Sequence, residues 1–181
     1  RYGDRLPGIL ISAISQIGMA VPSFWTGIIL MYIFGLTLRW VSPGGYTPWS
    51  VDPVEAFKSL LLPAVAIALP SIAAVIRYTR NTVMEQMKND YVRLAFSKGL
   101  KMNAVLFRHV LKNALIPVIT VLGMITANIL GGSIVIEQVF TLPGVGRLLI
   151  NAISVRDLPL VQGMVLYISL VIVVTNFLID I

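Results

Sequence analysis

The chain of 181 residues is 57% hydrophobic and only 12% charged, whereas about a quarter of the residues of an ordinary soluble domain are charged. Because a soluble core cannot bury so much apolar surface, the composition predicts an all-α, polytopic membrane protein. The net charge of +6 does not indicate nucleic-acid binding, since the basic residues cluster beside apolar spans and are not interleaved with aromatic side chains. The absence of cysteine excludes disulfides, thiolate metal sites and cysteine nucleophiles.

The first residues lead directly into an apolar span. RYGDRLPGIL does not have the form of a signal peptide, because the apolar run after it is longer than a signal-peptide core, and we expect the chain to be a segment of something longer. A first transmembrane helix is predicted at 9–38, with a kink at Pro22. Ser12 and Gln16 give its first half a weakly polar side, which either packs on another helix or lines a water path.

Apolar runs later in the chain are also long enough to cross a bilayer. They predict three further transmembrane helices, at 59–76, 114–136 and 159–179. The helix at 59–76 is expected to continue past the membrane to Met87, because nothing breaks its pattern before Asn89. Pro117 is expected in the first turn of the next span, where a missing N–H costs little.

The intervals between the spans differ in charge. The central interval, 77–113, carries eight Lys and Arg, whereas the two intervals on the opposite side, 39–58 and 137–158, carry four together. By the positive-inside rule 77–113 is cytoplasmic, the other two intervals are extracytoplasmic, and both visible termini are cytoplasmic. Pro and Gly make 39–58 a loop, with aromatic residues where an interfacial belt belongs: Trp40, Tyr46 and Trp49. The interval 137–158 is a turn followed by residues at helical spacing, which predicts a short surface helix.

The cytoplasmic interval contains two short helical patterns joined at a glycine. Asp90 is the predicted N-cap of a helix over Tyr91–Lys98, and Gly99 is placed to end this helix in a left-handed conformation. Asn103 is the predicted cap of a second helix, 104–113, that leads into the next span.

The first of these short helices has an apolar face. Tyr91, Leu94 and Ala95 share it at helical spacing, and Val92 and Phe96 widen it. A short helix this apolar, beyond the membrane, either lies on the lipid headgroups or fits a groove in a partner protein.

Three motifs carry a family resemblance. DYVRLAFSKGL at 90–100, followed by RHVLKNALIP at 108–117, resembles the cytoplasmic EAA loop of bacterial ABC importer permeases, most closely the dipeptide, oligopeptide and nickel branch. PSFW at 22–25 is similar to a further family motif, as is a series of residues near the C-terminal end: Glu137, Phe140, Leu142, Pro143, Gly144, Val145, Gly146, Asp157, Pro159, Gln162 and Gly163. Together the motifs extend over nearly the whole chain.

The sequence departs from the general EAA pattern at its first position. Arg93, Leu94 and Ala95 stand where the general loop has Glu-Ala-Ala, so the acidic residue is missing. An arginine in a first helical turn lies at the unfavourable, positive end of the helix dipole. Members of this family bind cytoplasmic ATPase subunits, and a carboxylate on such a subunit is the suggested counter-charge. Members of the family usually have six transmembrane helices, so the resemblance implies a single, partial transmembrane domain over 1–181.

The resemblance also implies partners and site residues. A similar second permease, two cytoplasmic ATPase subunits that hold ATP and Mg, and an extracytoplasmic binding protein are implied, in a bacterial inner membrane, with no cofactor on this chain. The implied cargo is a di- or oligopeptide, with nickel, glutathione or another small solute as alternatives. The implied ATPase-coupling residues are Asp90, Tyr91, Arg93, Leu94, Ala95, Lys98, Gly99 and Leu100. The implied extracytoplasmic gate or docking residues are Glu137, Leu142, Pro143, Gly144, Gly146 and Asp157.

Other functional classes find less support in the residues. No ionisable residue lies in the middle of a predicted span, which argues against a proton- or sodium-coupled carrier, and a secondary transporter or channel is only a remote alternative. His109 has no carboxylate or histidine neighbour, so no metal site and no catalytic residue are predicted, and no nucleotide-binding or hydrolase motif is present. Pore-lining candidates are Ser12, Gln16, Thr126 and Asn128, for which helix packing is the alternative role.

Overall fold

The computed structural model describes residues 16 and 18–180, and every regular element in that part of the chain is helical. Ser12 and the first part of the span predicted at 9–38 therefore lie outside the described residues. In chain order the elements are α2 (Ser23–Leu30), the π-helix η1 (Met31–Thr37), α3 (Pro53–Gln86), α4 (Asp90–Ser97), α5 (Met102–Val105), the π-turn η2 (Leu106–Val110), α6 (Leu111–Val139), α7 (Val145–Ser154) and α8 (Leu158–Asp180).

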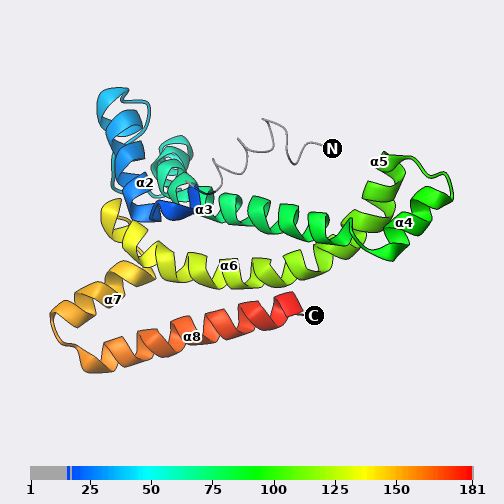
Figure 1. The fold of residues 1–181 in the computed structure, drawn as a ribbon. Coiled ribbons are helices and arrows are strands. Elements are labelled where there is room, and N and C mark those ends of the chain that lie inside the picture. Colours follow the sequence, from blue (N-terminus) through cyan, green and yellow to red (C-terminus); the bar gives the residue numbers. More distant parts are fainter. Residues whose placement is uncertain (1–15, 17, 181) are drawn as a thin grey trace.

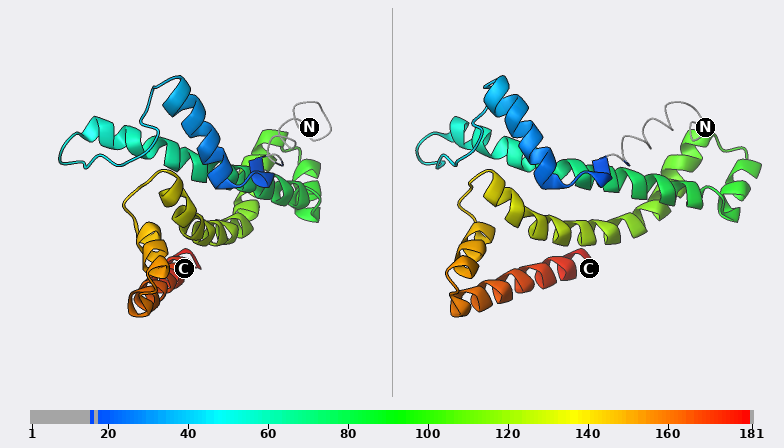
Figure 2. Two further views of the ribbon diagram at one scale, coloured as in Figure 1. Left: turned by 90° about the vertical axis from the view of Figure 1, so that its left-hand side faces the viewer. Right: turned by 60° about the vertical axis from the view of Figure 1, so that its left-hand side comes forward.

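Three of the described helices are long and apolar enough to cross a membrane. They are α3, the continuous helix Met102–Val139 that contains α6, and α8. In Figure 1 these helices lie roughly parallel, with α4 and α5 at one end and α7 at the other. The further views in Figure 2 agree that α6 runs beside α3 and that α8 runs beside α6. The arrangement is an all-α membrane bundle, as the composition predicted.

Two of these helices are longer than a bilayer requires. The 34 residues of α3 span about 50 Å, and the 38 residues of Met102–Val139 span somewhat more, at about 1.5 Å per residue. The hydrocarbon core is only about 30 Å thick. Both helices therefore continue beyond it toward α4, and α3 includes the extension past residue 76 that the sequence predicted.

Proline positions differ from expectation in two helices. Pro22 does not kink a continuous helix; its backbone is extended (φ −61°, ψ 142°), and its carbonyl accepts the N–H groups of Trp25 and Thr26 as α2 begins. Pro117 lies inside α6 and not in a first turn, because the helix is already formed before it. Its ring removes the N–H that would bond the carbonyl of Asn113.

The main apolar core lies where α2, α3 and α6 meet. Leu62 and Ala66 of α3 are buried against Ile136 and Phe140 at the end of α6. Gly27 of α2 completes the contact, since a Cβ added there would lie 3.0 Å from Cε2 of Phe140. Small residues let the helix backbones approach closely, as is usual between membrane helices.

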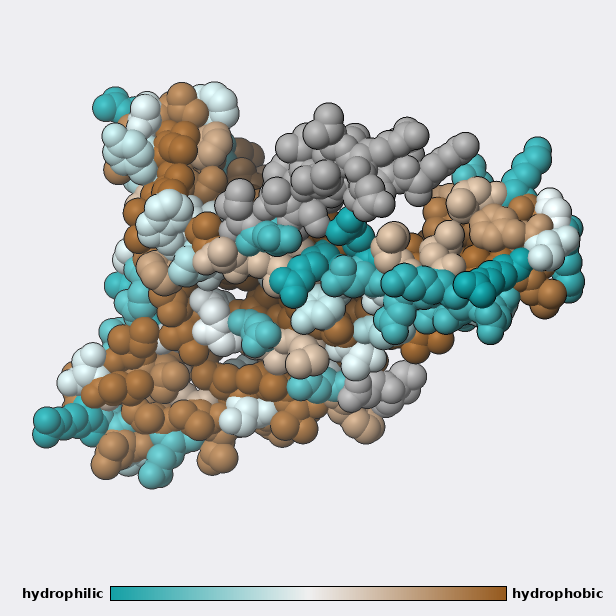
Figure 3. Space-filling model, in the orientation of Figure 1, coloured by the Kyte–Doolittle hydropathy of each residue, from teal (hydrophilic) through white to brown (hydrophobic). Residues whose placement is uncertain are grey.

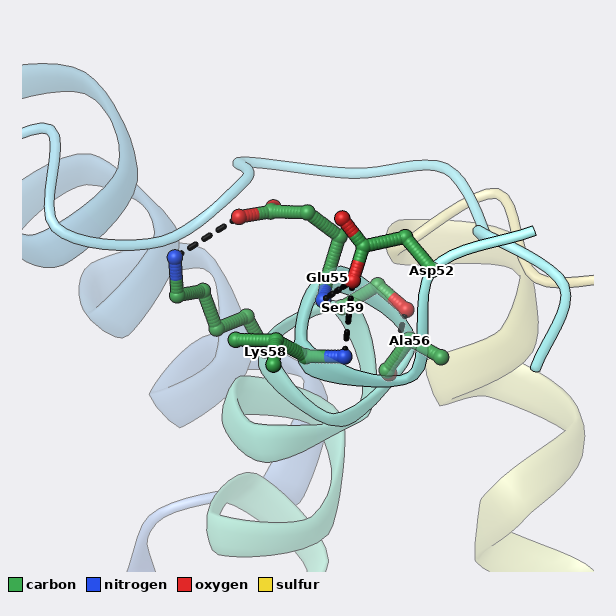
Figure 4. A network of polar contacts seen from close by, with 6 residues as sticks. Asp52, Glu55, Ala56, Lys58 and Ser59 are labelled. Carbon is green, nitrogen blue, oxygen red and sulfur yellow. Dashed lines mark hydrogen bonds and ion pairs between the residues drawn. The ribbon is translucent and has the colours of Figure 1, made fainter.

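The start of α3 is fixed by a capping network, shown in Figure 4. The Oδ1 atom of Asp52 accepts the N–H groups of Val54 and Glu55 at 2.9 and 3.1 Å, so α3 begins at Pro53 and not at residue 59 as predicted. Nζ of Lys58 donates to Oε1 of Glu55 at 2.7 Å, and the two side chains form an ion pair. Glu55 and Lys58 are three residues apart, so their ion pair bridges the first turns of α3.

Candidate functional site

The segment α4–α5, at one end of the long helices, has its own small core. Val92 and Ala95 of α4 are buried against Val105 and Val110 of the following helix. Partly buried side chains from the end of α3 and from both short helices pack around them: Val83, Met87, Tyr91 and Leu106. This packing joins α4 to both long helices, so α4 is a fixed part of the fold.

A glutamine holds the junction between α3 and α4. Oε1 of Gln86 accepts the side-chain N–H of Asn89 at 3.0 Å and the hydroxyl of Tyr91 at 2.9 Å. The predicted N-cap was wrong by one residue: Asn89 occupies the N-cap position, and Asp90 is in the first turn of α4, where its charge favours the helix dipole. No sequence pattern indicates this role of Gln86, because it depends on the turn that follows the residue.

The end of α4 confirms the prediction for Gly99. Its φ is +78°, in the left-handed region. The N–H of Leu100 donates to the carbonyl of Ala95 at 3.3 Å and the N–H of Gly99 donates to that of Phe96 at 2.9 Å, which is a Schellman motif. No atom of the described chain lies within 4 Å of a Cβ built at Gly99, so the constraint on this position is conformational and not steric.

The apolar face predicted for α4, with Tyr91, Leu94 and Ala95, does not pack as one surface. Tyr91 and Ala95 point toward the core, but Leu94 is 57% exposed, because Val92 takes the inward position in its place. Other large apolar side chains around α4 and α5 are also exposed: Phe96, Leu100, Met102 and Phe107. Lys98 is exposed beside them. The segment therefore has an apolar outer surface in addition to its buried core.

Arg93 has a counter-charge within its own helix. Its Nη1 lies 3.8 Å from Oδ1 of Asp90, and the two side chains are 80% and 98% exposed. An ion pair this long and this exposed contributes little to stability. Asn103 is not a cap, since the second short helix begins at Met102 after Lys101 and continues through η2 into α6.

The turn between α6 and α7 brings together most of the second group of predicted residues. Oε2 of Glu137 accepts the backbone N–H of Arg147 at 2.9 Å, in the first turn of α7, and Nη1 of Arg147 donates to the carbonyl of Thr141 at 3.1 Å. A Cβ at Gly144 would collide with the Glu137 carboxyl, and one at Gly146 would lie 2.5 Å from Cα of Ile134. Glu137 thus caps a helix ten residues downstream, and both glycines are required for that approach.

The last turn of α6 is closed by a residue in an unfavourable conformation. Thr141 has φ +57°, and the N–H of Leu142 donates to the carbonyl of Glu137 at 2.9 Å, the same Schellman geometry as at Gly99. Leu142 then packs on the core. The carbonyl of Phe140 accepts the N–H of Gly45 at 2.8 Å, which ties the loop before α3 to this turn.

Replacing Thr141 with glycine is expected to raise the free energy of unfolding by up to about 1 kcal/mol. A left-handed conformation costs a non-glycine residue about 1–2 kcal/mol, and part of that relief is offset by the greater freedom of glycine in the unfolded chain. Thermal unfolding of the full-length protein in detergent measures the change. Thr141→Ala keeps the strain and is the matched control; equal stabilisation by both variants would contradict this explanation.

Two predicted docking residues have different surroundings. Oδ1 of Asp157 accepts the N–H of Leu160 at 3.1 Å, so this side chain caps the start of α8. Pro143 is exposed and lines an open groove of about 580 Å³ along α7, with Gly144, Val145, Arg147, Leu148 and Asn151. Of the six predicted residues, Pro143 and Gly144 line this groove, and Glu137 and Gly146 shape the turn behind it.

The predicted pore residues do not form one group. The hydroxyl of Thr126 donates to the carbonyl of Leu122 at 2.8 Å within its own helix, whereas Gln16 is exposed on the short helical stretch before α2. Asn128 lines a cavity of about 290 Å³ between α2, α3 and α6. Ser23, from the PSFW motif, and Ser71, which had no predicted role, also line this cavity. Among the predicted pore residues that the structure describes, Asn128 is therefore the one that lines this mostly apolar cavity.

The whole chain also matches a known protein family. The family model described as "binding-protein-dependent transport system inner membrane component" covers residues 1–181. The chain belongs to this family. The three long apolar helices fit the inner-membrane component that this family description names.

Curated relatives are similar over most of the chain. A Brucella abortus protein that carries the name of a peptide transport system permease protein is 44% identical over 171 residues, or 94% of this chain and 54% of the relative. The oligopeptide transport system permease protein AppB of Bacillus subtilis is 39% identical, over 94% of this chain and 55% of its own. The di/tripeptide transport system permease protein DppB of Pseudomonas aeruginosa is 35% identical, over 94% and 57%. The chain spans about half the length of the curated relatives it matches.

Proposed function

We propose that the permease forms half of the translocation pathway of an ATP-driven importer of di- and oligopeptides, and that α4 couples it to a cytoplasmic ATPase. One observation carries the proposal: α4 uses Val92 and Ala95 for its own packing and still exposes Leu94 at the far end of the long helices. Phe107, in the next helical segment, is 66% exposed. Apolar side chains left exposed beyond the bilayer fit a partner's groove.

The way in which α4 is held supports a mechanical role. α3 runs into α4 through the Gln86 junction, and the continuous helix Met102–Val139 leaves from the turn at Gly99. A displacement of α4 by a partner therefore moves the ends of two helices that cross the membrane. The ATPase would hold ATP and Mg and, by closing around them, bias the permease between two states. The coupling residues are the exposed part of 90–100, with Gly99 setting the turn.

The charge distribution supports an orientation for this assembly. Eight Lys and Arg lie in 77–113, at the end of the molecule where α4 and α5 lie in Figure 1. The intervals 39–58 and 137–158, at the opposite end, contain only four: Arg39, Lys58, Arg147 and Arg156. The α4–α5 end is then cytoplasmic. The groove along α7 faces outward, where a binding protein would deliver cargo, and a second permease would complete the pathway.

The substrate class is inferred from the relatives. Three of them carry names of peptide, oligopeptide or di/tripeptide transport permeases. The cavity that Asn128 lines is mostly apolar, with Asn128, Ser23 and Ser71 as its polar side chains and no ionisable residue. Such a lining suits the amide groups of a peptide backbone, which need hydrogen-bond donors and acceptors and no fixed counter-charge.

The test is uptake by the complete transporter reconstituted in vesicles with its ATPase and binding protein. Accumulation of a labelled di- or tripeptide should require ATP and should be reduced by unlabelled peptides but not by nickel or glutathione. Inhibition by nickel or glutathione alone would move the substrate to another member of the same branch. Uptake driven by an ion gradient without ATP would contradict the proposal and favour a secondary transporter.

A further inference from the structure

A pocket of about 500 Å³ lies where η1 ends and the loop before α3 begins. Its walls include three charged side chains, Arg39, Glu55 and Lys58, and the aromatic ring of Trp40. The coupling proposal uses none of them. The remaining lining comes from the end of η1 and from the loop: Gly35, Leu36, Val41, Ser42 and Pro43.

The walls of this pocket are fixed by direct contacts. A Cβ at Gly35 would lie 2.8 Å from Cα of Pro43, so helix and loop backbones touch there. The rings of Phe34 and Trp40 pack with centroids 5.7 Å apart. The hydroxyl of Ser42 donates to the carbonyl of Gly44 at 2.8 Å. The pocket is therefore a formed feature of the fold and not a gap beside a loose loop.

Arg39 holds an unusual position in this wall. Its φ is +56°, a left-handed conformation that costs a non-glycine residue about 1–2 kcal/mol and that occurs often at functional sites. The N–H of Trp40 donates to the carbonyl of Phe34 at 2.9 Å and so closes the π-helix around Arg39. π-Helical turns are themselves frequent at functional sites. Glycine would adopt this left-handed conformation at a lower free-energy cost, but the residue at position 39 is an arginine.

The charges in the pocket do not balance. Lys58 is paired with Glu55 at 2.7 Å, whereas the Arg39 side chain is exposed and has no ion pair or hydrogen bond within the described part of the chain. Among the described residues, the guanidinium of Arg39 is therefore left without a counter-charge. A guanidinium in this setting binds a phosphate or carboxylate, preferably through two parallel hydrogen bonds.

The surroundings of the pocket distinguish between possible anions. Leu36, in its wall, is 54% exposed, and Tyr32, one helical turn earlier, is 64% exposed. In Figure 3 the surface over α2 and η1 is largely apolar, with hydrophilic residues at its outer end. Trp40 is 66% exposed at this boundary, where an interfacial aromatic residue belongs. An acidic soluble protein would match the charge of Arg39 but not the apolar surface that leads away from it.

We propose that this pocket binds the phosphodiester headgroup of an anionic phospholipid. The guanidinium of Arg39 donates to the phosphate oxygens, Trp40 lies against the glycerol region, and the acyl chains follow the exposed side chains of Leu36 and Tyr32. The lipid holds the outer end of η1, and with it the loop that is tied to Phe140, at a fixed depth in the membrane. The site is at the opposite end of the helices from α4 and does not depend on the coupling proposal.

The test is quenching of tryptophan fluorescence by brominated lipid in vesicles that contain the full-length permease. Brominated phosphatidylglycerol and brominated phosphatidylcholine are each titrated into phosphatidylcholine vesicles, and Trp40→Phe identifies the part of the signal that comes from the pocket. The wild-type site should prefer phosphatidylglycerol by about fivefold, the contribution of one basic residue near an anionic surface. The preference should fall as salt rises from about 0.1 M to about 1 M.

Matched variants decide the outcome. Arg39→Gln should abolish the preference and Arg39→Lys should restore most of it, which also shows that the loop remains folded. Arg156→Gln is the control, because Arg156 is exposed and has φ +58° but lies outside the pocket. An unchanged preference in Arg39→Gln would overturn the proposal. If this variant kept the lipid preference and also lost binding of an acidic extracytoplasmic protein, the pocket would be a protein docking site and not a lipid site.

Discussion

Gly99→Val is expected to lower ATP-driven uptake by about tenfold or more, while membrane insertion and ATP hydrolysis persist. Gly99 has φ +78°, and a valine in that conformation costs about 1–2 kcal/mol, which corresponds to roughly a tenfold loss of the native turn. The two hydrogen bonds that end α4 would be lost, and α4 would no longer be held in register with α5. Uptake and ATP hydrolysis are measured on the same reconstituted transporter.

The control at this position is Gly99→Asn. Asparagine tolerates the left-handed conformation, and open space surrounds the Cβ position within the described chain, so this variant should transport at close to the wild-type rate. Normal uptake by Gly99→Val would show that the turn does not transmit force. Equal loss in both variants would mean that residue 99 needs the absence of a side chain, as a tight partner contact would require.

Gly146→Val is expected to destabilise the permease by about 3 kcal/mol or more. A Cβ at Gly146 lies 2.5 Å from Cα of Ile134, and the backbone of α6 cannot move aside as a flexible side chain could. α7 would be pushed away from α6, and the hydrogen bond from the Arg147 N–H to Glu137 would be broken. The apparent melting temperature of the full-length protein in detergent should fall accordingly.

Gly163→Val is the matched control for this substitution. Gly163 lies in α8, and no atom of the described chain lies within 4 Å of its Cβ position. We expect its melting temperature to remain within the range of ordinary surface substitutions. Equal melting temperatures for Gly146→Val and the wild type would mean that α7 does not pack on α6 as described.

Local sequence rules predicted the elements whose cause is local. Apolar length identified the long helices, and a glycine after a helical pattern identified the left-handed turn at Gly99, which the structure confirms. The same rules failed where two choices are locally equivalent. Asn89 and Asp90 are both good N-cap residues, so the cap was placed one residue late. On α4, spacing alone could not decide whether Leu94 or Val92 faces inward, because the packing of Val105 and Val110 makes that choice.

Long-range contacts account for the residues that sequence reasoning missed. Gly144 and Gly146 were predicted as turn residues, whereas Glu137 was singled out only through the family resemblance. The carboxylate of Glu137 accepts the N–H of Arg147 across the loop, and the two glycines leave room for this approach. In the sequence Arg39 is only one of the basic residues counted in 39–58, since a φ of +56° leaves no trace in composition. The strained threonine at position 141 is invisible for the same reason.

The most direct test of the central claim is a cross-link from α4 in the intact membrane. The described chain contains no cysteine, so Leu94→Cys introduces a unique thiol into this segment on an outward-facing position. A thiol-directed photo-crosslinker at this residue should capture the cytoplasmic ATPase subunit, with a yield that changes when ATP closes the ATPase dimer. Val155→Cys, at a residue that is more exposed and lies at the opposite end, should not capture it. Capture of lipid alone at position 94, or of an extracytoplasmic protein, would contradict the account.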